Sequence, residues 1–294
     1  MIKITTPSAL SHIGDNNRLY GAPCAMERSV ITFSGKNNIL YCEEGVTLTD
    51  AKLSFKGDNS VIYLSRSQTG YPLTRIDVHH DCVCAFGPQD MISPHGTLEI
   101  IASEHSHCVF GEACFISLEV FIRTSDAHAI FSATTKERVA KPKSVFIGDH
   151  VWLGQGVTLM KGTRIDSGAI VGSAACVAGK RIAHNSSWAG NPAKQIGTGI
   201  FWNPSPVHGW TAADGEQYTD YASFSGSAKD IVPKLYLPRW QGEDAFIFSY
   251  DDKEAIRYED MDAALSSAKD AEERYLYLKN LYENPAKNRF VHGE

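Results

Sequence analysis

An aliphatic residue that recurs at every sixth position is the feature that most constrains how this chain folds. The series runs unbroken through Ile147, Leu153, Leu159, Ile165, Val171 and Val177. An α-helix does not give this pattern, because six residues are not a whole number of 3.6-residue turns. Four positions after each of these residues stands a mostly small or β-branched one, until Arg181 interrupts the series. The period therefore predicts short strands joined by regular corners.

Stacked six-residue units predict a solenoid. Three units close a triangular coil of about 18 residues, and stacked coils bury a continuous apolar prism. The same phase runs backwards through Phe110, Ile116 and Ile122. Two earlier segments, GKNNILY (35–41) and GDNSVIY (57–63), repeat each other at a spacing of 22 residues, which fits coils with small insertions. We therefore expect an all-β protein in which residues 30–197 form one parallel β-solenoid after an N-terminal segment, 1–29; a β-sandwich is the alternative.

Net charge and hydropathy argue against two classes of partner. The formal net charge of the 294-residue chain is −6, and no block of like charges stands out, which argues against nucleic-acid binding through a basic face. The N-terminus MIKITTPSALSHIG has no apolar signal region, and no stretch approaches the roughly 18 apolar residues that a membrane span needs. We therefore expect a cytoplasmic protein with no membrane span.

The cysteines and histidines do not predict a metal site. Seven cysteines occur in a chain without an export signal, which favours free thiols over a disulfide framework. The run HHDCVC brings together four possible ligands, His79, His80, Cys82 and Cys84. It lacks a second ligand pair at zinc spacing, and we therefore predict no bound metal.

The six-residue rhythm is interrupted once. It can be followed up to Ser125 and again from Val145, and between them lies a polar segment, rich in Lys and Arg, that carries a single histidine, His128. A stretch that leaves the repeat and rejoins it in phase predicts a loop extruded from one coil, over residues 128–144.

At this point the chain resembles the hexapeptide-repeat acyltransferases. The resemblance is carried by SDAHAI, by TKERVAKPKSVFIGDHVWLGQGVTLMKGTRI, by AIVGSAACVAGK and by AGNPAKQI. Within that family the pattern looks most like bacterial capsule and other surface-polysaccharide O-acetyltransferases, including the polysialic acid O-acetyltransferases. The resemblance implies a left-handed parallel β-helix with an extruded catalytic loop, acetyl-CoA as donor, and a homotrimer with active sites between subunits.

The resemblance also assigns roles at the start of the loop. His128 matches the family's catalytic histidine, and a neutral imidazole suits the task of removing a proton from a sugar hydroxyl. An acetyl thioester is already activated, so transfer can be direct. Asp126 is placed to orient the ring and stabilise the imidazolium; an aspartate that only caps a turn is the alternative.

Six further residues are predicted to line the site. Trp152 stands at an outward position and is expected in the acyl or acceptor pocket; packing under the loop is the alternative. By the family pattern, the pantetheine arm of coenzyme A would lie near Gln155, Ser173 and Ala178. Lys180 or Lys194 is placed to meet its phosphates. A solvated surface lysine accounts equally well for either.

The last hundred residues, 198–294, form an aromatic-rich extension. Residues 201–258 hold 12 of the 30 aromatic side chains, which either stack on the acceptor sugar or pack against the scaffold. Residues 260–283 show the periodicity of one amphipathic helix, with Asp260 placed to cap it and Asn284–Pro285 to end it.

Together these observations predict an acetyl-CoA-dependent O-acetyltransferase with a carbohydrate acceptor, a polysaccharide or its precursor. Two alternatives stay open on the sequence alone. One is an N-acetyltransferase of a nucleotide-linked amino sugar, and the other is a non-catalytic solenoid that binds glycan.

Overall fold

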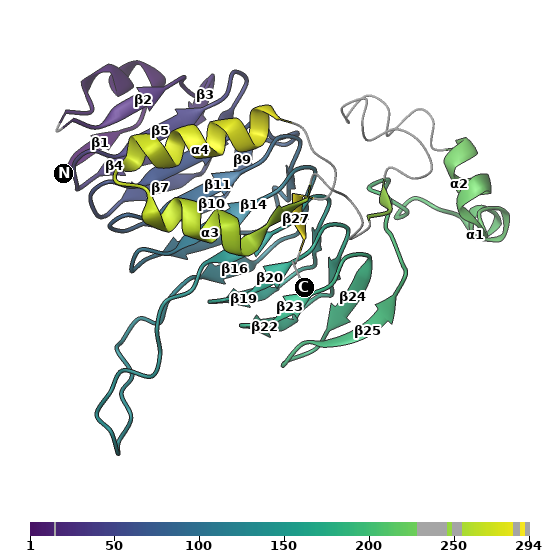
Figure 1. Cartoon of the computed structure of the whole chain (residues 1–294). Coiled ribbons are helices and arrows are strands. Elements are labelled where there is room, and N and C mark those ends of the chain that lie inside the picture. The colour runs from purple at the N-terminus through teal and green to yellow at the C-terminus, as the bar shows by residue number, and fades with distance from the viewer. Residues whose placement is uncertain (15, 228–245, 249–254, 285–288, 292–294) are drawn as a thin grey trace.

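The computed structural model describes residues 1–14, 16–227, 246–248, 255–284 and 289–291. Most of these residues form a three-sided stack of short strands, from which one long loop projects and on which two helices lie (Figure 1). The three sides are called wall A, wall B and wall C below.

Each wall is a ladder of strands that are distant in sequence. Wall A comprises β1 (Ile2–Ile4), β4 (Val30–Phe33), β7 (Lys52–Phe55), β10 (Thr74–Val78), β13 (Leu98–Ala102), β16 (Val120–Arg123), β19 (Thr158–Met160) and β22 (Cys176–Ala178). Wall B comprises β2 (Arg18–Tyr20), β5 (Ile39–Cys42), β8 (Val61–Leu64), β11 (Val83–Phe86), β14 (His107–Phe110), β17 (Val145–Ile147), β20 (Arg164–Ile165) and β23 (Arg181–Ile182). Wall C has an upper part, β3 (Ala25–Glu27), β6 (Thr47–Thr49) and β9 (Tyr71–Pro72), and a lower part, β12 (Met91–Ile92), β15 (Phe115–Ile116), β18 (Trp152–Leu153), β21 (Ile170–Val171), β24 (Ser186–Ala189) and β25 (Lys194–Thr198).

The chain visits walls B, C and A in rotation, and successive coils pair in parallel. Only the terminal strands β1 and β25 join their walls antiparallel. The six aliphatic residues of the repeat, from Ile147 to Val177, fall on successive strands and are all fully buried. The predicted parallel β-solenoid is therefore confirmed, with one strand for each six-residue unit.

The solenoid begins earlier than the sequence predicted. Residues 1–29 are not a separate segment, because β2 pairs with β5 and β3 with β6 to form the first coil. The 3₁₀ helix Pro7–His12 places the buried side chain of Leu10 against the end of the prism. A terminal coil has a neighbour on one side only, and its repeat pattern is correspondingly weak.

Polar ladders hold the corners between walls A and B. Asn37 and Asn59 adopt positive φ angles of 56° and 62°, which asparagine tolerates better than most residues. The neighbouring Asn38 accepts the Ser60 amide through Oδ1 at 2.9 Å. This is why the coils GKNNILY and GDNSVIY repeat their polar residues at a spacing of 22.

The predicted loop leaves the prism at one of these corners. The chain departs after β16 and returns at β17, and in Figure 1 the intervening segment projects well beyond the stack. A bridge between Phe131 and Arg138 pairs its outgoing and returning halves. The backbone N–H of Lys143 donates to the carbonyl of Thr124 at 3.0 Å, so the two ends of the loop meet at its base.

The C-terminal helices cover wall B (Figure 1). The sequence predicted one helix over 260–283, but the structure has two, α3 (Tyr258–Ser267) and α4 (Ala271–Glu283). Ala268 is extended, with ψ of 131°, and Asp270 caps α4 by accepting the Glu273 amide at 3.0 Å. Asp260 lies inside the first turn of α3 and is not its cap.

The break between the helices is fixed by buried Arg274. Its guanidinium, on a side chain only 1% exposed, donates to the carbonyls of Leu265, Ala268 and Asn59. The turn thus satisfies a buried cation while both helices lay their apolar faces on the outer side chains of wall B.

The other described elements are short. They are α1 (Ala212–Gln217), α2 (Tyr221–Ser227), β26 (Ile256–Arg257) and β27 (Arg289–Val291). In the described part of the chain, no helix combines the length and the apolar character needed to cross a bilayer.

Candidate functional site

The base of the loop places His128 at the corner between walls A and B. Thr124 and Ser125 are buried, and the chain emerges into solvent a few residues later, so that the His128 side chain is exposed. The Ser125 hydroxyl lies 2.6 Å from that of Ser103 on the preceding coil. The backbone that leads to His128 is therefore anchored, while the ring itself projects outward.

Asp126 contacts a different partner from the one the sequence suggested. Its carboxylate forms an ion pair with Lys161, which lies at the next corner of the same edge. Both side chains are about three-quarters buried, at 24% and 23% exposure. Lys161 is 35 residues away, and no local pattern marks it as a partner. The orienting role of Asp126 toward His128 stays a prediction.

Trp152 lies outward on wall C, as predicted, and is 38% exposed. Its indole N–H lies 3.4 Å from the Ser117 hydroxyl, a long hydrogen bond. The ring meets Phe115 edge-on at a centroid distance of 6.4 Å and lies 5.8 Å from Trp202. It does not pack under the loop of its own chain, because the loop leaves from the opposite corner of the prism.

The residues behind Trp152 were not predicted as part of a site. Trp202 lies flat against His150, and Phe246 covers another part of the same imidazole, at a centroid distance of 4.4 Å. Asn185 fastens this segment by donating to the carbonyls of Ile200 and Phe246. Trp202 and Phe246 of the extension therefore pack against the scaffold, with Trp202 next to the exposed Trp152.

The predicted donor residues fall into two groups. Gln155 and Ser173 are exposed at the corner between walls C and A, on successive coils, and the Gln155 carbonyl accepts the Ala174 amide at 2.7 Å. Ala178 is exposed at the end of β22, and exposed Lys194 begins β25. These residues flank the outer face of wall A.

Lys180 is partly committed to internal contacts. Its ammonium donates to the Ala193 carbonyl at 2.8 Å and lies 5.9 Å from the centre of the Trp188 ring. A phosphate would have to compete with these contacts for Lys180. Lys194 is exposed, and its role at a phosphate stays a prediction.

The prism separates His128 from Trp152. In a triangular cross-section the corner between walls A and B lies opposite wall C, so the hydrophobic core stands between the two residues. One chain therefore does not place the imidazole and the exposed indole in the same cleft. Wall B is covered by α3 and α4, and within the described part of the chain neither of these helices lies on wall A or wall C.

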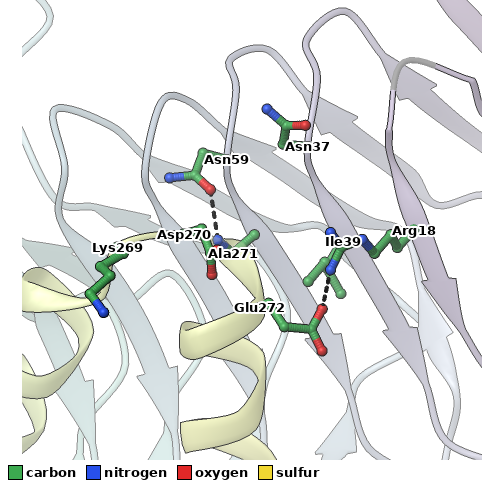
Figure 2. Close-up of a pocket in the computed structure, with 8 residues that line it drawn as sticks. All are labelled: Arg18, Asn37, Ile39, Asn59, Lys269, Asp270, Ala271 and Glu272. Atoms are coloured by element: carbon green, nitrogen blue, oxygen red, sulfur yellow. Dashed lines mark hydrogen bonds and ion pairs between the residues drawn. The ribbon is translucent and has the colours of Figure 1, made fainter.

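The described surface also contains a polar cavity of about 440 Å³ at the N-terminal end of the prism (Figure 2). It lies between Arg18 and the start of α4, where Glu272 pairs with Arg18 at 2.5 Å. None of the predicted catalytic or donor residues lines this cavity.

The described residues contain no group of three or more His, Cys, Asp or Glu side chains arranged to hold a metal ion. In the HHDCVC run, Cys82 and Cys84 point into the core, whereas His80 is exposed and accepts the Asp58 amide through Nδ1 at 3.0 Å. All seven cysteines are free thiols.

The chain is similar in sequence to two polysialic acid O-acetyltransferases. No protein-family model matches the chain. A polysialic acid O-acetyltransferase of Neisseria meningitidis is 28% identical over 149 residues, which span 50% of this chain and 67% of that protein. A polysialic acid O-acetyltransferase of Escherichia coli is 34% identical over 102 residues, 35% of this chain and 33% of that protein.

Two solved structures share the architecture. The polysialic acid O-acetyltransferase OatWY aligns with a TM-score of 0.57 at 25% identity, over 68% of this chain and 94% of that one. The polysialic-acid-specific acetyltransferase NeuO aligns with a TM-score of 0.58 at 27% identity, over 72% and 91%. The chain is an acyltransferase with the β-helix fold of these proteins.

The strands, the loop and the helices described above fit this fold. The acyltransferase has a left-handed parallel β-helix, with a loop that interrupts one coil and a C-terminal extension that contains the helices α3 and α4. Two helices on wall B and an aromatic segment behind Trp152 pack around the prism of this acyltransferase.

Proposed function

We propose that this acyltransferase moves an acetyl group from acetyl-CoA to a sugar hydroxyl of a surface polysaccharide or its precursor. The observation that carries the proposal is the loop, which leaves an otherwise regular prism and presents an exposed imidazole at its base. The similarity to named O-acetyltransferases supports it. Because acetyl-CoA is a cytoplasmic metabolite, the proposal puts the reaction in the cytoplasm.

The proposed mechanism is direct transfer with His128 as general base. The neutral imidazole takes the proton of the acceptor hydroxyl as its oxygen attacks the thioester carbonyl. The tetrahedral intermediate collapses, the carbon–sulfur bond breaks, and the coenzyme A thiolate takes the proton from the imidazolium. Asp126 would stabilise that cation; its present partner, Lys161, would have to share the carboxylate.

The acceptor is proposed to be a glycan held against Trp152. A half-exposed indole offers an apolar face for a sugar ring, and Trp202 keeps that face in place from behind. The loop adds the cations Lys136, Lys141 and Lys143, which favour an acidic polysaccharide. The named relatives act on polysialic acid, which is such a polymer.

The proposed site is shared between subunits of a homotrimer. His128 and Trp152 lie on opposite sides of one prism, and the described helices α3 and α4 occupy only wall B. Three copies closed around one axis bring wall A of one chain to wall C of the next through identical contacts. A cleft between two walls would also hold the narrow coenzyme A molecule near Gln155, Ser173, Ala178, Lys180 and Lys194.

The proposal is tested by screening purified polysaccharides for release of coenzyme A, followed by NMR of the product. We expect release with an acidic polysaccharide and new acetyl-ester signals on a ring hydroxyl. Release only with nucleotide-linked amino sugars would instead indicate N-acetylation. Binding of glycan without any release under all conditions would indicate a non-catalytic solenoid.

A further inference from the structure

The returning end of the loop is tied to a helix far along the chain. Ser144, the residue before β17, is 5% exposed, and its hydroxyl lies 2.6 Å from Oδ1 of Asp262 on α3. The same hydroxyl oxygen accepts the backbone N–H of His107 at 3.0 Å. A serine hydroxyl has one proton, and here that proton is donated to the Asp262 carboxylate.

Ser144 differs from the residues that link successive coils elsewhere along the corner between walls A and B. On earlier coils Asn17, Asn38 and Ser60 each accept the amide of the following coil, all within the solenoid. Ser144 instead accepts the amide of the coil before it, that of His107. Ser144 also donates a hydrogen bond to a residue outside the solenoid, Asp262, which lies 118 positions later in the chain. A hydrogen bond to an ionised group is about twice as strong as one between neutral groups. The bond between Ser144 and Asp262 is partly buried.

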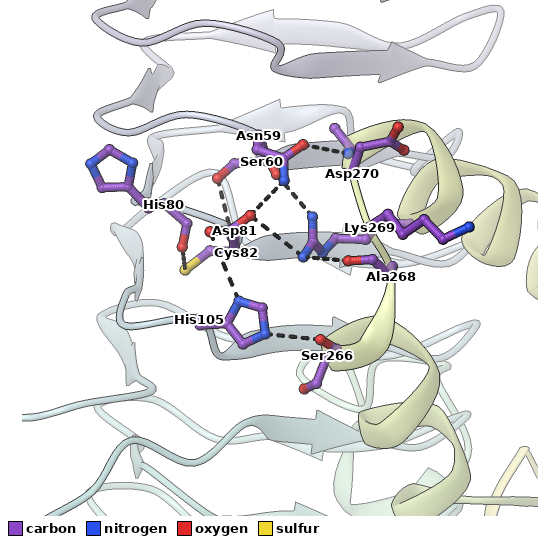
Figure 3. A network of polar contacts seen from close by, with 12 residues as sticks. Asn59, Ser60, His80, Asp81, Cys82, His105, Ser266, Ala268, Lys269 and Asp270 are labelled. Carbon is purple, nitrogen blue, oxygen red and sulfur yellow. Dashed lines mark hydrogen bonds and ion pairs between the residues drawn. The ribbon is translucent and has the colours of Figure 1, made fainter.

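Helix α3 is fixed to the same turn of the solenoid that restrains the loop. His105 donates through Nε2 to the Ser266 carbonyl at 2.9 Å (Figure 3), and the Ser266 hydroxyl lies 3.4 Å from Nε2 of buried His107. The adjacent Glu104 accepts two hydrogen bonds from Arg138 in the loop, at 2.7 and 2.9 Å. The helix and the loop therefore share one anchor.

A shift of Ser144 would be transmitted to the backbone that carries His128. Lys143, its neighbour, donates to the Thr124 carbonyl, and Thr124 is four residues before His128. The Thr124 hydroxyl oxygen in turn accepts two hydrogen bonds, one from the Ser103 amide at 3.1 Å and one from the Ser106 hydroxyl at 2.7 Å. The two ends of the loop thus form one hydrogen-bonded unit with the Asp262 contact at its edge.

We propose that Asp262 is a positioning residue, through which α3 holds the base of the loop and so sets the place of His128. The catalytic consequence rests on the proposed function, whereas the restraint on the loop does not. The C-terminal helices then have a second task besides covering wall B: they brace the one segment of the prism that departs from the repeat.

The test compares three variants in the full-length chain: Asp262→Ala, Asp262→Asn and Glu259→Gln. Asn keeps a carbonyl oxygen that can accept from Ser144. Glu259 lies on the same helix and pairs with Arg164 of wall B rather than with a loop residue, which makes it the matched control. Three quantities are measured: kcat for acetyl transfer, the dissociation constant for coenzyme A, and the rate of tryptic cleavage after Lys136 and Arg138.

For Asp262→Ala we expect kcat to fall by about 10- to 100-fold, because small misplacements of a catalytic group carry penalties of this size. Loop cleavage should accelerate by about tenfold, with little change in coenzyme A affinity. Asp262→Asn should stay within about threefold of the parent in each quantity, and Glu259→Gln should match the parent.

Two results would overturn the inference. One is that Asp262→Ala shows the cleavage rate of Glu259→Gln, and the other is that its loop is freed while kcat is unchanged. A failure of the proposed function looks different: His128→Ala would keep its turnover, or no glycan would be acetylated. The cleavage rates would still report whether Asp262 restrains the loop.

Discussion

The indole of Trp202 and the imidazole of His150 lie face to face, with ring centroids 4.0 Å apart and planes inclined by 2°. They exchange hydrogen bonds as well: His150 donates through Nε2 to the Trp202 carbonyl at 3.0 Å, and the Trp202 indole N–H donates to the His150 carbonyl at 2.9 Å. This reciprocal pair joins the C-terminal extension to the corner beside Trp152, and it buries a titratable ring.

Stability should therefore fall in mild acid. Burial lowers the pKa of His150 to about 4, against about 6.5 in an unfolded chain. Between these values the unfolded state binds the extra proton, so stability is complete above pH 6.5 and is lost as pH falls toward 4. This difference in pKa corresponds to about 3 kcal/mol of the free energy of unfolding. We expect His150→Gln to lower stability at pH 7 and to weaken its dependence on pH.

The measurement is urea unfolding at intervals from pH 7.5 to 4.5. His95→Gln, which changes an exposed ring, is the control. Burial also lowers the pKa of His107, to about 3, so His150→Gln should retain part of the acid slope. An unchanged slope in His150→Gln would show that this imidazole is not the group responsible.

His128→Ala should lower kcat by about 10²- to 10⁴-fold, because a general base acts on the transition state. The fold and the affinity for coenzyme A should be nearly unaffected, since the side chain is exposed. Steady-state kinetics, with circular dichroism and calorimetric titration of coenzyme A, measure these effects. Turnover close to that of the parent would remove His128 from the mechanism.

Acetyl transfer should proceed without a covalent enzyme intermediate. Burial raises the pKa of the Cys84 and Cys114 thiols well above the usual range, which disfavours the nucleophilic thiolate. We expect sequential kinetics and an unmodified protein mass after mixing with acetyl-CoA alone. Intact-mass spectrometry tests this, and a stable acetyl adduct on Cys114 or Cys176 would contradict it.

Variants on opposite sides of the prism should complement each other. If a cleft combines His128 of one chain with Trp152 of the next, a mixed trimer of His128→Ala and Trp152→Ala chains contains some clefts with both residues intact. Co-refolded mixtures should therefore regain partial activity, while each variant alone stays inactive. The control is a mixture of two His128→Ala preparations. A protein that is fully active and sediments with the mass of a monomer would exclude this arrangement.

Several features could be predicted from the sequence because they depend on neighbours in the chain. The buried series from Ile147 to Val177 follows from a period that only a three-sided coil satisfies. The loop was visible as a segment that leaves this period and returns in phase. The outward position of Trp152 followed from the same count.

Contacts between distant segments were decided only by the tertiary structure. The pattern over 260–283 indicated one helix, but packing on wall B and the buried Arg274 favour two. Local spacing gave no indication that Asp126 pairs with Lys161, or that Ser144 contacts Asp262. The physical reason is that a solenoid repeat specifies which side chains point inward. The contacts of its outward side chains depend on which other segments of the folded chain pack against them. The sequence by itself thus determined the prism, and the folded chain determined what surrounds it.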